Sequence, residues 1–337
     1  THVIAEVSSH AIDLRRVDSC DFDIGIFTNL TPEHLDYHVT MENYFQAKKR
    51  FFSEVLPQSK KNIVNKMIIN GDEEWGQRIL KEVSLPSINY GTGSKNDVRA
   101  INYDLSLKGI NAQIDLVGEE ITIQSELIGK FNLLNILAAM AGAKALGISS
   151  GEIKLGIEKL KRIPGRLEKI ESSLGISVFV DYAHKADALQ QVLENLVQFR
   201  KKRLITVFGC GGNRDRGKRP LMGNTATSYS DLTIVTSDNP RKEDPLAIIN
   251  EIEAGIDKQK VKKMIAHSSL NGDAVHAYII VPERRDAIAT AIHLAQKDDI
   301  ILIAGKGHEN YQIVGTKKHS FDDRIIAEEA LNLRGNE

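Results

Sequence analysis

The sequence predicts an α/β protein of two domains, and three observations lead to this prediction. The 337 residues are enough for two domains. The second half alternates apolar strands with helical segments at the spacing of a doubly wound sheet. Between the halves, the segment IPGR at 163–166 places Pro and Gly after a basic helix end, which is typical of a linker. We therefore expect domains at residues 1–163 and 164–337.

Composition and charge exclude several classes of protein. The chain is 42% hydrophobic and 26% charged, as ordinary globular proteins are. Its formal net charge of −1 indicates no basic surface for nucleic acid, and no apolar run reaches membrane-spanning length. Cys20 and Cys210 lie far apart without metal-ligand spacing, and the first residues do not form a signal peptide. We expect a cytoplasmic protein with neither nucleic acid nor a membrane as a partner.

The first domain begins with two predicted strands. Residues 3–7 are expected to form a buried parallel strand that is entered midway, so that the chain resembles a fragment. Glu6 lies within it, and a buried carboxylate needs either an arginine or a metal ion as a partner. The second strand, 23–28, leads into a polar turn with several carboxylates and imidazoles, among them His34. Such groups at a strand end can hold a divalent metal, or they form a solvated loop before the amphipathic helix predicted at 41–52.

The remaining elements of the first domain are a strand, an antiparallel region and two helices. They are expected at residues 63–70, at 98–128, from Gly129 onward within the stretch 126–148, and at 151–160. Gly129 opens a helix that is apolar on nearly all sides and therefore buried. Asn132 and Asn135 lie three residues apart on one face of it, either as capping and core groups or as ligand contacts.

The second domain places polar segments after its predicted strands. The strands are expected at residues 176–180, 204–208, 231–236, 277–281 and 300–304. The segments that follow four of them are DYAH (181–184), GCGGNRDRGKRPLMG (209–223), DNPR (238–241) and GKGHE (305–309). In a parallel sheet these segments meet at one edge, where ligands bind. Lys218 and Arg219 are interpreted as helix-start and surface charges.

These motifs together resemble the Mur ligase family. The blocks EVSSH, TNLTPEHLDYH with YFQAKKRFF, GKFNLLN, GRLE, DYAH and DNPR occur in the family's order and cover essentially the whole chain. The resemblance is strongest to the branch that adds meso-diaminopimelate to UDP-MurNAc-L-Ala-D-Glu during peptidoglycan synthesis. It implies part of the central ATPase-type domain, followed by a Rossmann-like, doubly wound C-terminal domain. It also implies a monomeric ATP-dependent amide ligase that uses Mg²⁺ and forms an acyl phosphate.

The resemblance also implies the site residues. Lys48 (as a carbamate), His34 and Glu6 would be catalytic, and Glu6 and His34 would bind Mg²⁺. ATP contacts would come from Asn132, Asn135, Arg166 and Asp181. Ser8 and Arg16 would contact the UDP-MurNAc-dipeptide, although Leu14 stands where the family often has Gln. Contacts to meso-diaminopimelate would come from Arg214, Asp238, Asn239, Pro240, Arg241, Gly305 and Glu309.

The role implied for Lys48 makes a physical demand on its surroundings. Only a neutral amine adds CO₂, so the site must lower the lysine pKa by burial or by cationic neighbours. The other interpretation is a solvated helix lysine. Lys49 is the natural comparison, because adjacent helical residues do not share a face.

The sequence contains no P-loop of the form GxxxxGK[ST]. In the family that loop and the domain that binds UDP precede the EVSSH block, so we expect the chain to lack both and to be inactive alone. Two alternatives stay open: a non-catalytic ligase remnant, and a sister ligase that adds L-lysine.

Overall fold

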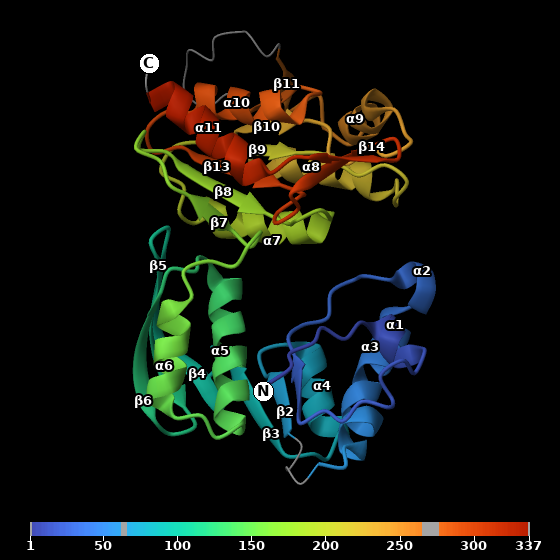
Figure 1. Cartoon of the computed structure of the whole chain (residues 1–337), viewed down its shortest axis with the longest axis vertical. Helices are drawn as coiled ribbons and strands as arrows, with labels where there is room; N and C mark the ends of the chain where they lie inside the picture. Colours follow the sequence, from blue (N-terminus) through green and yellow to red (C-terminus); the bar gives the residue numbers. More distant parts are fainter. Residues whose placement is uncertain (1, 62–65, 265–275, 336–337) are drawn as a thin grey trace. The chain divides into compact units, whose positions relative to one another are not determined.

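The computed structural model describes residues 2–61, 66–264 and 276–335. The chain divides into two compact units, unit 1 at residues 1–161 and unit 2 at 162–337 (Figure 1). The boundary predicted from the sequence follows residue 163. Each unit has its own sheet and is described separately.

Unit 1 contains a six-stranded sheet in the order β1-β2-β3-β4-β5-β6. Its strands are β1 (Ile24–Phe27), β2 (Lys66–Asn70), β3 (Ser87–Gly91), β4 (Val98–Ser106), β5 (Gly109–Leu116) and β6 (Glu120–Ser125). The pairs from β1 to β4 are parallel, and β4, β5 and β6 pair antiparallel. The antiparallel region predicted at 98–128 is therefore confirmed, with Gly109 and Gly118 at positive φ in its turns. Positions 63–65 of the predicted strand 63–70 lie outside the described residues.

The helices of unit 1 bury the sheet and shape the site. They are α1 (Ser9–Asp13), α2 (Leu35–His38), α3 (Met41–Arg50), α4 (Glu74–Glu82), α5 (Lys130–Ala145) and α6 (Ser150–Lys159). Helix α3 begins at Thr40, whose hydroxyl accepts a hydrogen bond from the Asn43 N–H, and it continues as a π-helical turn, η1 (Phe51–Val55), and a 3-10 turn, η2 (Leu56–Gln58). Helix α5 begins after Gly129, as predicted, and packs against β1 to β5.

The strand predicted at residues 3–7 is wrong. Residues 2–8 form no strand, and the side chains of Val3 and Ile4 are 93% and 97% exposed. Strand β1 pairs only with β2, and no strand lies on its other edge in the described part of unit 1. An apolar run becomes a buried strand only where neighbouring strands and covering helices remove it from water. Glu6 is exposed as well, so its carboxylate needs no buried partner.

Unit 2 contains a seven-stranded sheet in the order β11-β12-β10-β9-β13-β8-β7. Its strands are β7 (Glu168–Ile170), β8 (Ser177–Asp181), β9 (Leu204–Phe208), β10 (Leu232–Val235), β11 (Lys262–Lys263), β12 (Ala277–Ile280) and β13 (Ile300–Ala304). All pairs are parallel except β7 with β8. Strands β8 and β9 follow one another in the sequence, but β13 lies between them in the sheet, so the strand order reverses there. Ligands bind outside the carboxyl ends of strands at such a reversal.

The helices of unit 2 form two packed groups, consistent with the predicted doubly wound fold. They are α7 (Ala186–Val197), α8 (Lys218–Tyr229), α9 (Pro245–Glu253), α10 (Arg284–Leu294) and α11 (Asp323–Gly335). Helix α8 contacts both α7 and α9, whereas α10 contacts α11. A hairpin of β14 (Tyr311–Val314) and β15 (Lys317–Ser320) follows β13. Among the described residues of either unit, no helix is long and apolar enough to cross a membrane.

Candidate active site

Lys48 lies in a partly buried position on α3. Its Nζ is 5.4 Å from the centroid of the Tyr44 ring, one helical turn earlier. Burial lowers the pKa of Lys48, and the carboxylates of Glu33 and Glu6 oppose this shift. Lys49 instead forms an ion pair of 2.6 Å with Glu82. The two neighbouring lysines thus differ in their surroundings: burial favours the neutral amine of Lys48, which carbamylation requires, whereas Lys49 is paired with a carboxylate.

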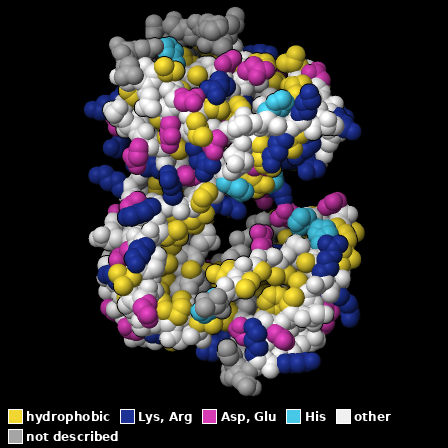
Figure 2. Space-filling model, viewed as in Figure 1, with side chains coloured by type: hydrophobic (Ala, Val, Ile, Leu, Met, Phe, Trp, Pro, Cys, Tyr) yellow, Lys and Arg dark blue, Asp and Glu magenta, His cyan; other side chains and the backbone are white. Residues whose placement is uncertain are grey.

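Imidazoles gather in the region of α1 and α2 in unit 1, where Figure 2 shows histidine side chains close together. The charge of Lys48 acts on one of them, His38. His34 has a left-handed backbone (φ 56°), and its Nε2 lies 3.2 Å from an oxygen of Glu33. The His10 ring meets the His34 ring edge-on at 4.7 Å. His38 stacks on Tyr44 at 5.0 Å, and burial lowers the His38 pKa. The turn after β1, the start of α1 and helix α3 therefore meet in one polar cluster.

His10 had not been predicted as part of the cluster. It is the last residue of the EVSSH block, which was the available signal. Ser8, earlier in this block, is exposed and caps α1 by accepting the Ala11 N–H at 3.1 Å, and Arg16 is exposed beyond the helix. Ser9 is buried, and its hydroxyl lies 2.9 Å from Nε2 of His38.

The metal ligands predicted for unit 1 are Glu6 and His34. The described residues contain no group of three His, Cys, Asp or Glu side chains that could hold a metal ion alone. Mg²⁺ commonly binds one or two protein groups and completes its shell with water and substrate phosphates. The exposed carboxylate of Glu6, close enough to Lys48 to act on its pKa, fits such a partial set.

Asn132 and Asn135, on α5, differ in environment. Asn132 is fully buried, and its side-chain N–H donates to the Ile128 carbonyl at 2.9 Å. Its Oδ1 is buried without a hydrogen-bond partner. Asn135 is exposed. The spacing of three residues therefore places the two amides near one another along the helix but gives them different access to solvent.

In unit 2, Asp181 at the end of β8 holds the turn that precedes β7. Its two carboxylate oxygens accept the N–H groups of Leu167 at 2.7 Å and Ala183 at 2.8 Å. Burial raises the Asp181 pKa, and these hydrogen bonds oppose the shift. The Tyr182 N–H also donates to the Gly165 carbonyl at 2.8 Å. Arg166, in the same turn, keeps an exposed side chain.

The residues after β10 and β13 meet at the carboxyl edge of the unit 2 sheet. Asn239 donates from its side chain to Glu309 Oε2 at 2.9 Å, and its Oδ1 accepts the Ile313 N–H at 2.8 Å. Gly305 has φ 116°, and a Cβ there would lie 2.9 Å from Oδ2 of the buried Asp238. A side chain at position 305 is therefore excluded by both backbone and space.

The side chains of Arg214 and Arg241 flank Gly211, in the turn after β9. A Cβ at Gly211 would lie 2.9 Å from an Arg241 nitrogen and 3.7 Å from Arg214 Cγ. Arg241 donates from this nitrogen to the Gly212 carbonyl at 2.9 Å. The Arg241 backbone, at φ 53° after Pro240, is held by hydrogen bonds with residues 313 and 315. The Arg241 guanidinium at this edge is a favourable partner for a carboxylate.

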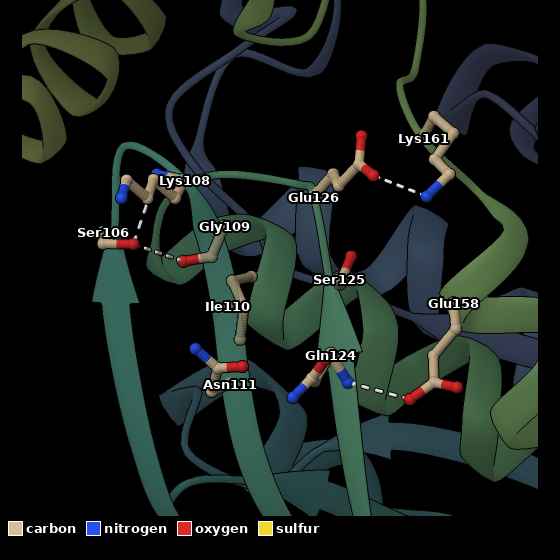
Figure 3. A pocket seen from close by; sticks show the side chains of 10 residues that line it. All are labelled: Ser106, Lys108, Gly109, Ile110, Asn111, Gln124, Ser125, Glu126, Glu158 and Lys161. Atoms are coloured by element: carbon tan, nitrogen blue, oxygen red, sulfur yellow. Dashed lines mark hydrogen bonds and ion pairs between the residues drawn. The ribbon is translucent and has the colours of Figure 1, made fainter.

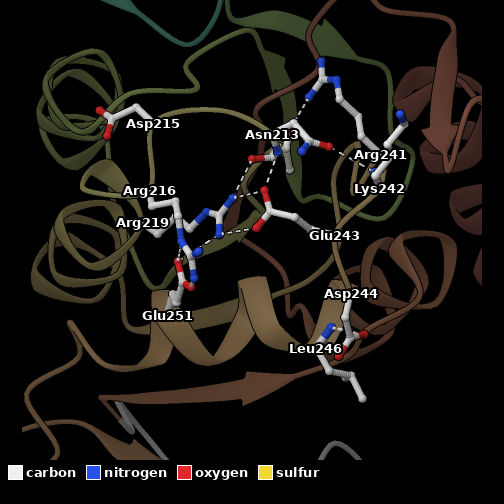
Figure 4. A network of polar contacts seen from close by, with 12 residues as sticks. Asn213, Asp215, Arg216, Arg219, Arg241, Lys242, Glu243, Asp244, Leu246 and Glu251 are labelled. Carbon is white, nitrogen blue, oxygen red and sulfur yellow. Dashed lines mark hydrogen bonds and ion pairs between the residues drawn. The ribbon is translucent and has the colours of Figure 1, made fainter. Parts of the chain in front are cut away.

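Two further cations were missed or misplaced by the sequence analysis. Lys306 is fully buried, and its Nζ lies 3.2 Å from Glu309 Oε2 and 3.3 Å from Asn239 Oδ1. The GKGHE block contained it, but its lysine was considered only as part of a P-loop. The interpretation of Arg219 as a surface charge is wrong, because its side chain is 0% exposed and ion-paired (Figure 4). Lys218 is partly buried and donates to the His184 carbonyl at 2.8 Å.

Comparison with known proteins identifies the family. The sequence profile of the Mur ligase middle domain matches residues 1–143, and that of the Mur ligase, glutamate ligase domain matches residues 165–307. The chain belongs to the Mur ligase family. This places the Lys48 cluster in the middle domain, and the Asn239 and Arg241 cluster in the glutamate ligase domain.

Two relatives of this Mur ligase chain bear the same name. The UDP-N-acetylmuramoyl-L-alanyl-D-glutamate--2,6-diaminopimelate ligase of Geobacter metallireducens is 48% identical over 322 residues, 96% of this chain and 63% of the relative. The protein of that name from Clostridioides difficile is 44% identical over 330 residues, 97% of this chain and 63% of the relative. The chain thus spans less than two thirds of their length.

Solved structures agree with the fold of this Mur ligase chain. A UDP-N-acetylmuramoyl-L-alanyl-D-glutamate--2,6-diaminopimelate ligase structure has a TM-score of 0.63 at 34% identity and covers 98% of this chain and 64% of its own. A Thermotoga maritima MurF ligase in complex with ADP has a TM-score of 0.63 at 18% identity, covering 97% and 65%, and supports the fold alone.

A separate cavity of about 350 Å³ opens on unit 1 of the Mur ligase chain (Figure 3). It is lined by Ser106, Lys108, Gly109, Ile110, Asn111, Gln124, Ser125, Glu126, Glu158 and Lys161. Glu126 pairs with Lys161, and Glu158 accepts the Gln124 N–H at 3.1 Å. None of the predicted site residues lines this cavity.

Proposed function

We propose that the chain is the middle and C-terminal part of an ATP-dependent ligase that adds meso-diaminopimelate to UDP-MurNAc-L-Ala-D-Glu (a ligase of the MurE type). The observation that carries the proposal is the Arg241 guanidinium beside Gly211, with the side chain of Arg214 next to the same glycine. The relatives named as 2,6-diaminopimelate ligases support it.

The amino-acid site is proposed at the carboxyl edge of the unit 2 sheet. Diaminopimelate differs from lysine by a second carboxylate at its far end. Arg241 offers that carboxylate a planar fork of donors, and Arg214 adds a second positive charge beside it. Glu309, oriented by the side chain of Asn239, pairs with the distal ammonium. Asp238, Pro240 and Gly305 shape this site.

Catalysis is proposed at the Lys48 cluster of unit 1. The dipeptide carboxylate attacks the γ-phosphorus of ATP, which gives an acyl phosphate and releases ADP. The amino group of meso-diaminopimelate then attacks the acyl carbon. A tetrahedral intermediate forms, from which phosphate leaves, and the nitrogen loses a proton. Bound Mg²⁺ supplies positive charge that stabilises the transferring phosphoryl group. Glu6 and His34 would hold it, while the neutral Lys48 amine adds CO₂ with loss of a proton and thereby becomes an anionic oxygen ligand.

The remaining assignments are part of the same proposal. Asn132, Asn135, Arg166 and Asp181 are proposed as ATP contacts, with Asp181 also holding the turn at Leu167. Ser8 and Arg16, both exposed, are proposed contacts of the UDP-MurNAc-dipeptide. We also propose that the protein acts as a monomer in the cytoplasm, on small-molecule substrates.

Steady-state ligation by the complete gene product tests the proposal. ADP release should depend on both UDP-MurNAc-L-Ala-D-Glu and meso-diaminopimelate, and meso-diaminopimelate should have a higher kcat/KM than L-lysine. A preference for L-lysine would identify a sister ligase. The proposed activity would be rejected if neither amino acid stimulated ADP release, or if the protein released no ADP under any condition.

A further inference from the structure

We propose that Arg219 and Glu243 are positioning residues that set the two guanidiniums of the amino-acid site. Arg219, on α8, pairs with Glu243, which ends the turn at 239–243 that carries Arg241 (Figure 4). The turn at 211–214, which carries Arg214, lies beside both residues. This inference rests on the proposed function, because it concerns how the same site recognises the amino-acid substrate.

Arg219 forms a buried fork on α8. One guanidinium nitrogen lies 2.9 Å from Glu243 Oε2 and the other 3.0 Å from Glu243 Oε1, so the pair is bidentate. The first nitrogen also reaches Glu251 at 2.8 Å, and the second donates to the Gly211 carbonyl at 3.3 Å. A bidentate Arg–carboxylate pair fixes orientation as well as distance. Through Arg219, α8 therefore holds the carboxylate of Glu243 in the 239–243 turn and the Gly211 carbonyl in the 211–214 turn.

Glu243 also forms a hydrogen bond with the neighbouring turn at 211–214. Its Oε1 accepts the backbone N–H of Asn213, the residue before Arg214. The Asn213 side chain in turn accepts the Lys242 N–H at 3.1 Å. Asn213 is at φ 51°, an uncommon backbone for a residue other than glycine, and these contacts stabilise it.

The two turns are also joined by their own backbone. The Gly212 N–H donates to the Asn239 carbonyl at 2.9 Å, and Arg241 donates to the Gly212 carbonyl at 2.9 Å. A shift of the 211–214 turn would therefore move Arg214 and remove a hydrogen bond from Arg241. Arg219 and Glu243 act on the substrate only through these two arginines, which is why we call them positioning residues.

The chain offers a matched control on the same segment. Arg216 pairs with Glu251, as Arg219 does, but its side chain is 68% exposed, and Glu251 lies on α9 and on neither turn. Arg216→Gln removes one positive charge from the same region, as Arg219→Gln does. Of the two substitutions in the Arg219–Glu243 pair, Glu243→Gln is the milder, because glutamine keeps the size of the side chain and one acceptor oxygen.

The test is steady-state kinetics and hydrogen exchange of the complete gene product. Glu243→Gln and Arg219→Gln should raise KM for meso-diaminopimelate by about tenfold, within the range of residues that share one network. KM for ATP and for the dipeptide should stay within about twofold, since binding of those substrates is untouched. The amides of Gly212 and Asn213 should exchange faster in both variants, and Arg216→Gln should change none of these quantities.

A double-mutant cycle separates positioning from general stabilisation. In the Arg214→Ala/Arg241→Ala background, Glu243→Gln should raise KM for meso-diaminopimelate by less than about twofold, because its effect passes through those two arginines. An equal effect in both backgrounds, or an equal rise of KM for all three substrates, would overturn the inference. Unchanged hydrogen exchange at the amides of Gly212 and Asn213 in both variants would also overturn the inference, whatever the changes in KM. Loss of meso-diaminopimelate dependence already in the wild type would instead reject the proposed function.

Discussion

Replacement of Arg241 by alanine should selectively impair the use of meso-diaminopimelate. Truncating one partner of a hydrogen-bonded charge pair costs about 2–5 kcal/mol when the pair is buried. Arg241 is partly exposed, and one of its nitrogens already donates to the Gly212 carbonyl at 2.9 Å. We therefore expect the lower end, about 2 kcal/mol, which corresponds to about a 30-fold loss of kcat/KM.

The assay is ADP release by the complete gene product with meso-diaminopimelate and with L-lysine. Lysine lacks the second carboxylate, so its kcat/KM should change by less than about threefold. Arg241→Lys should show an intermediate loss, because it keeps the charge without the planar fork. Lys242→Ala is the control, since Lys242 is exposed on the same turn. Unchanged kinetics of Arg241→Ala with meso-diaminopimelate, or an equal loss for both amino acids, would refute the reasoning.

Three other predictions follow from single side chains. Lys48→Ala should nearly abolish ligation and regain part of it with added short carboxylic acids, whereas Lys49→Ala should change ADP release little; equal activity of both variants would contradict the carbamate. Arg284→Met removes a fully buried ion pair and should lower the free energy of unfolding in urea by about 3–5 kcal/mol, against about 0–1 kcal/mol for the exposed Arg285→Ala; similar midpoints would argue against this. Burial lowers the His184 pKa below 6.5, the ordinary value for histidine, so that near and just below pH 6.5 the unfolded state binds more protons than the folded state. The free energy of unfolding should therefore fall as the pH drops through 6.5. If His184→Gln leaves the pH dependence of unfolding unchanged, His184 makes no such contribution.

Local pattern in the sequence was enough for most strands and for the polar segments that follow them. The strands at 204–208 and 300–304 occur as predicted, because continuous apolar runs of this length suit a sheet covered on both faces. The polar segments after the strands also meet at one edge, since parallel strands bring their carboxyl ends together. The residues proposed for the amino-acid site, such as Asn239 and Glu309, follow from this rule and from the motifs.

Burial and pairing of individual groups were decided only by the tertiary structure. Val3 and Ile4 have the pattern of a strand, but among the described residues no strand pairs with them, so they remain exposed. Arg219 and Lys306 look like surface charges, yet carboxylates on other segments remove the cost of burying them. The pattern of a segment records its preference for water or for a face of an element. It does not record which distant residue lies opposite, and for a charged side chain that distant partner determines whether burial is tolerated.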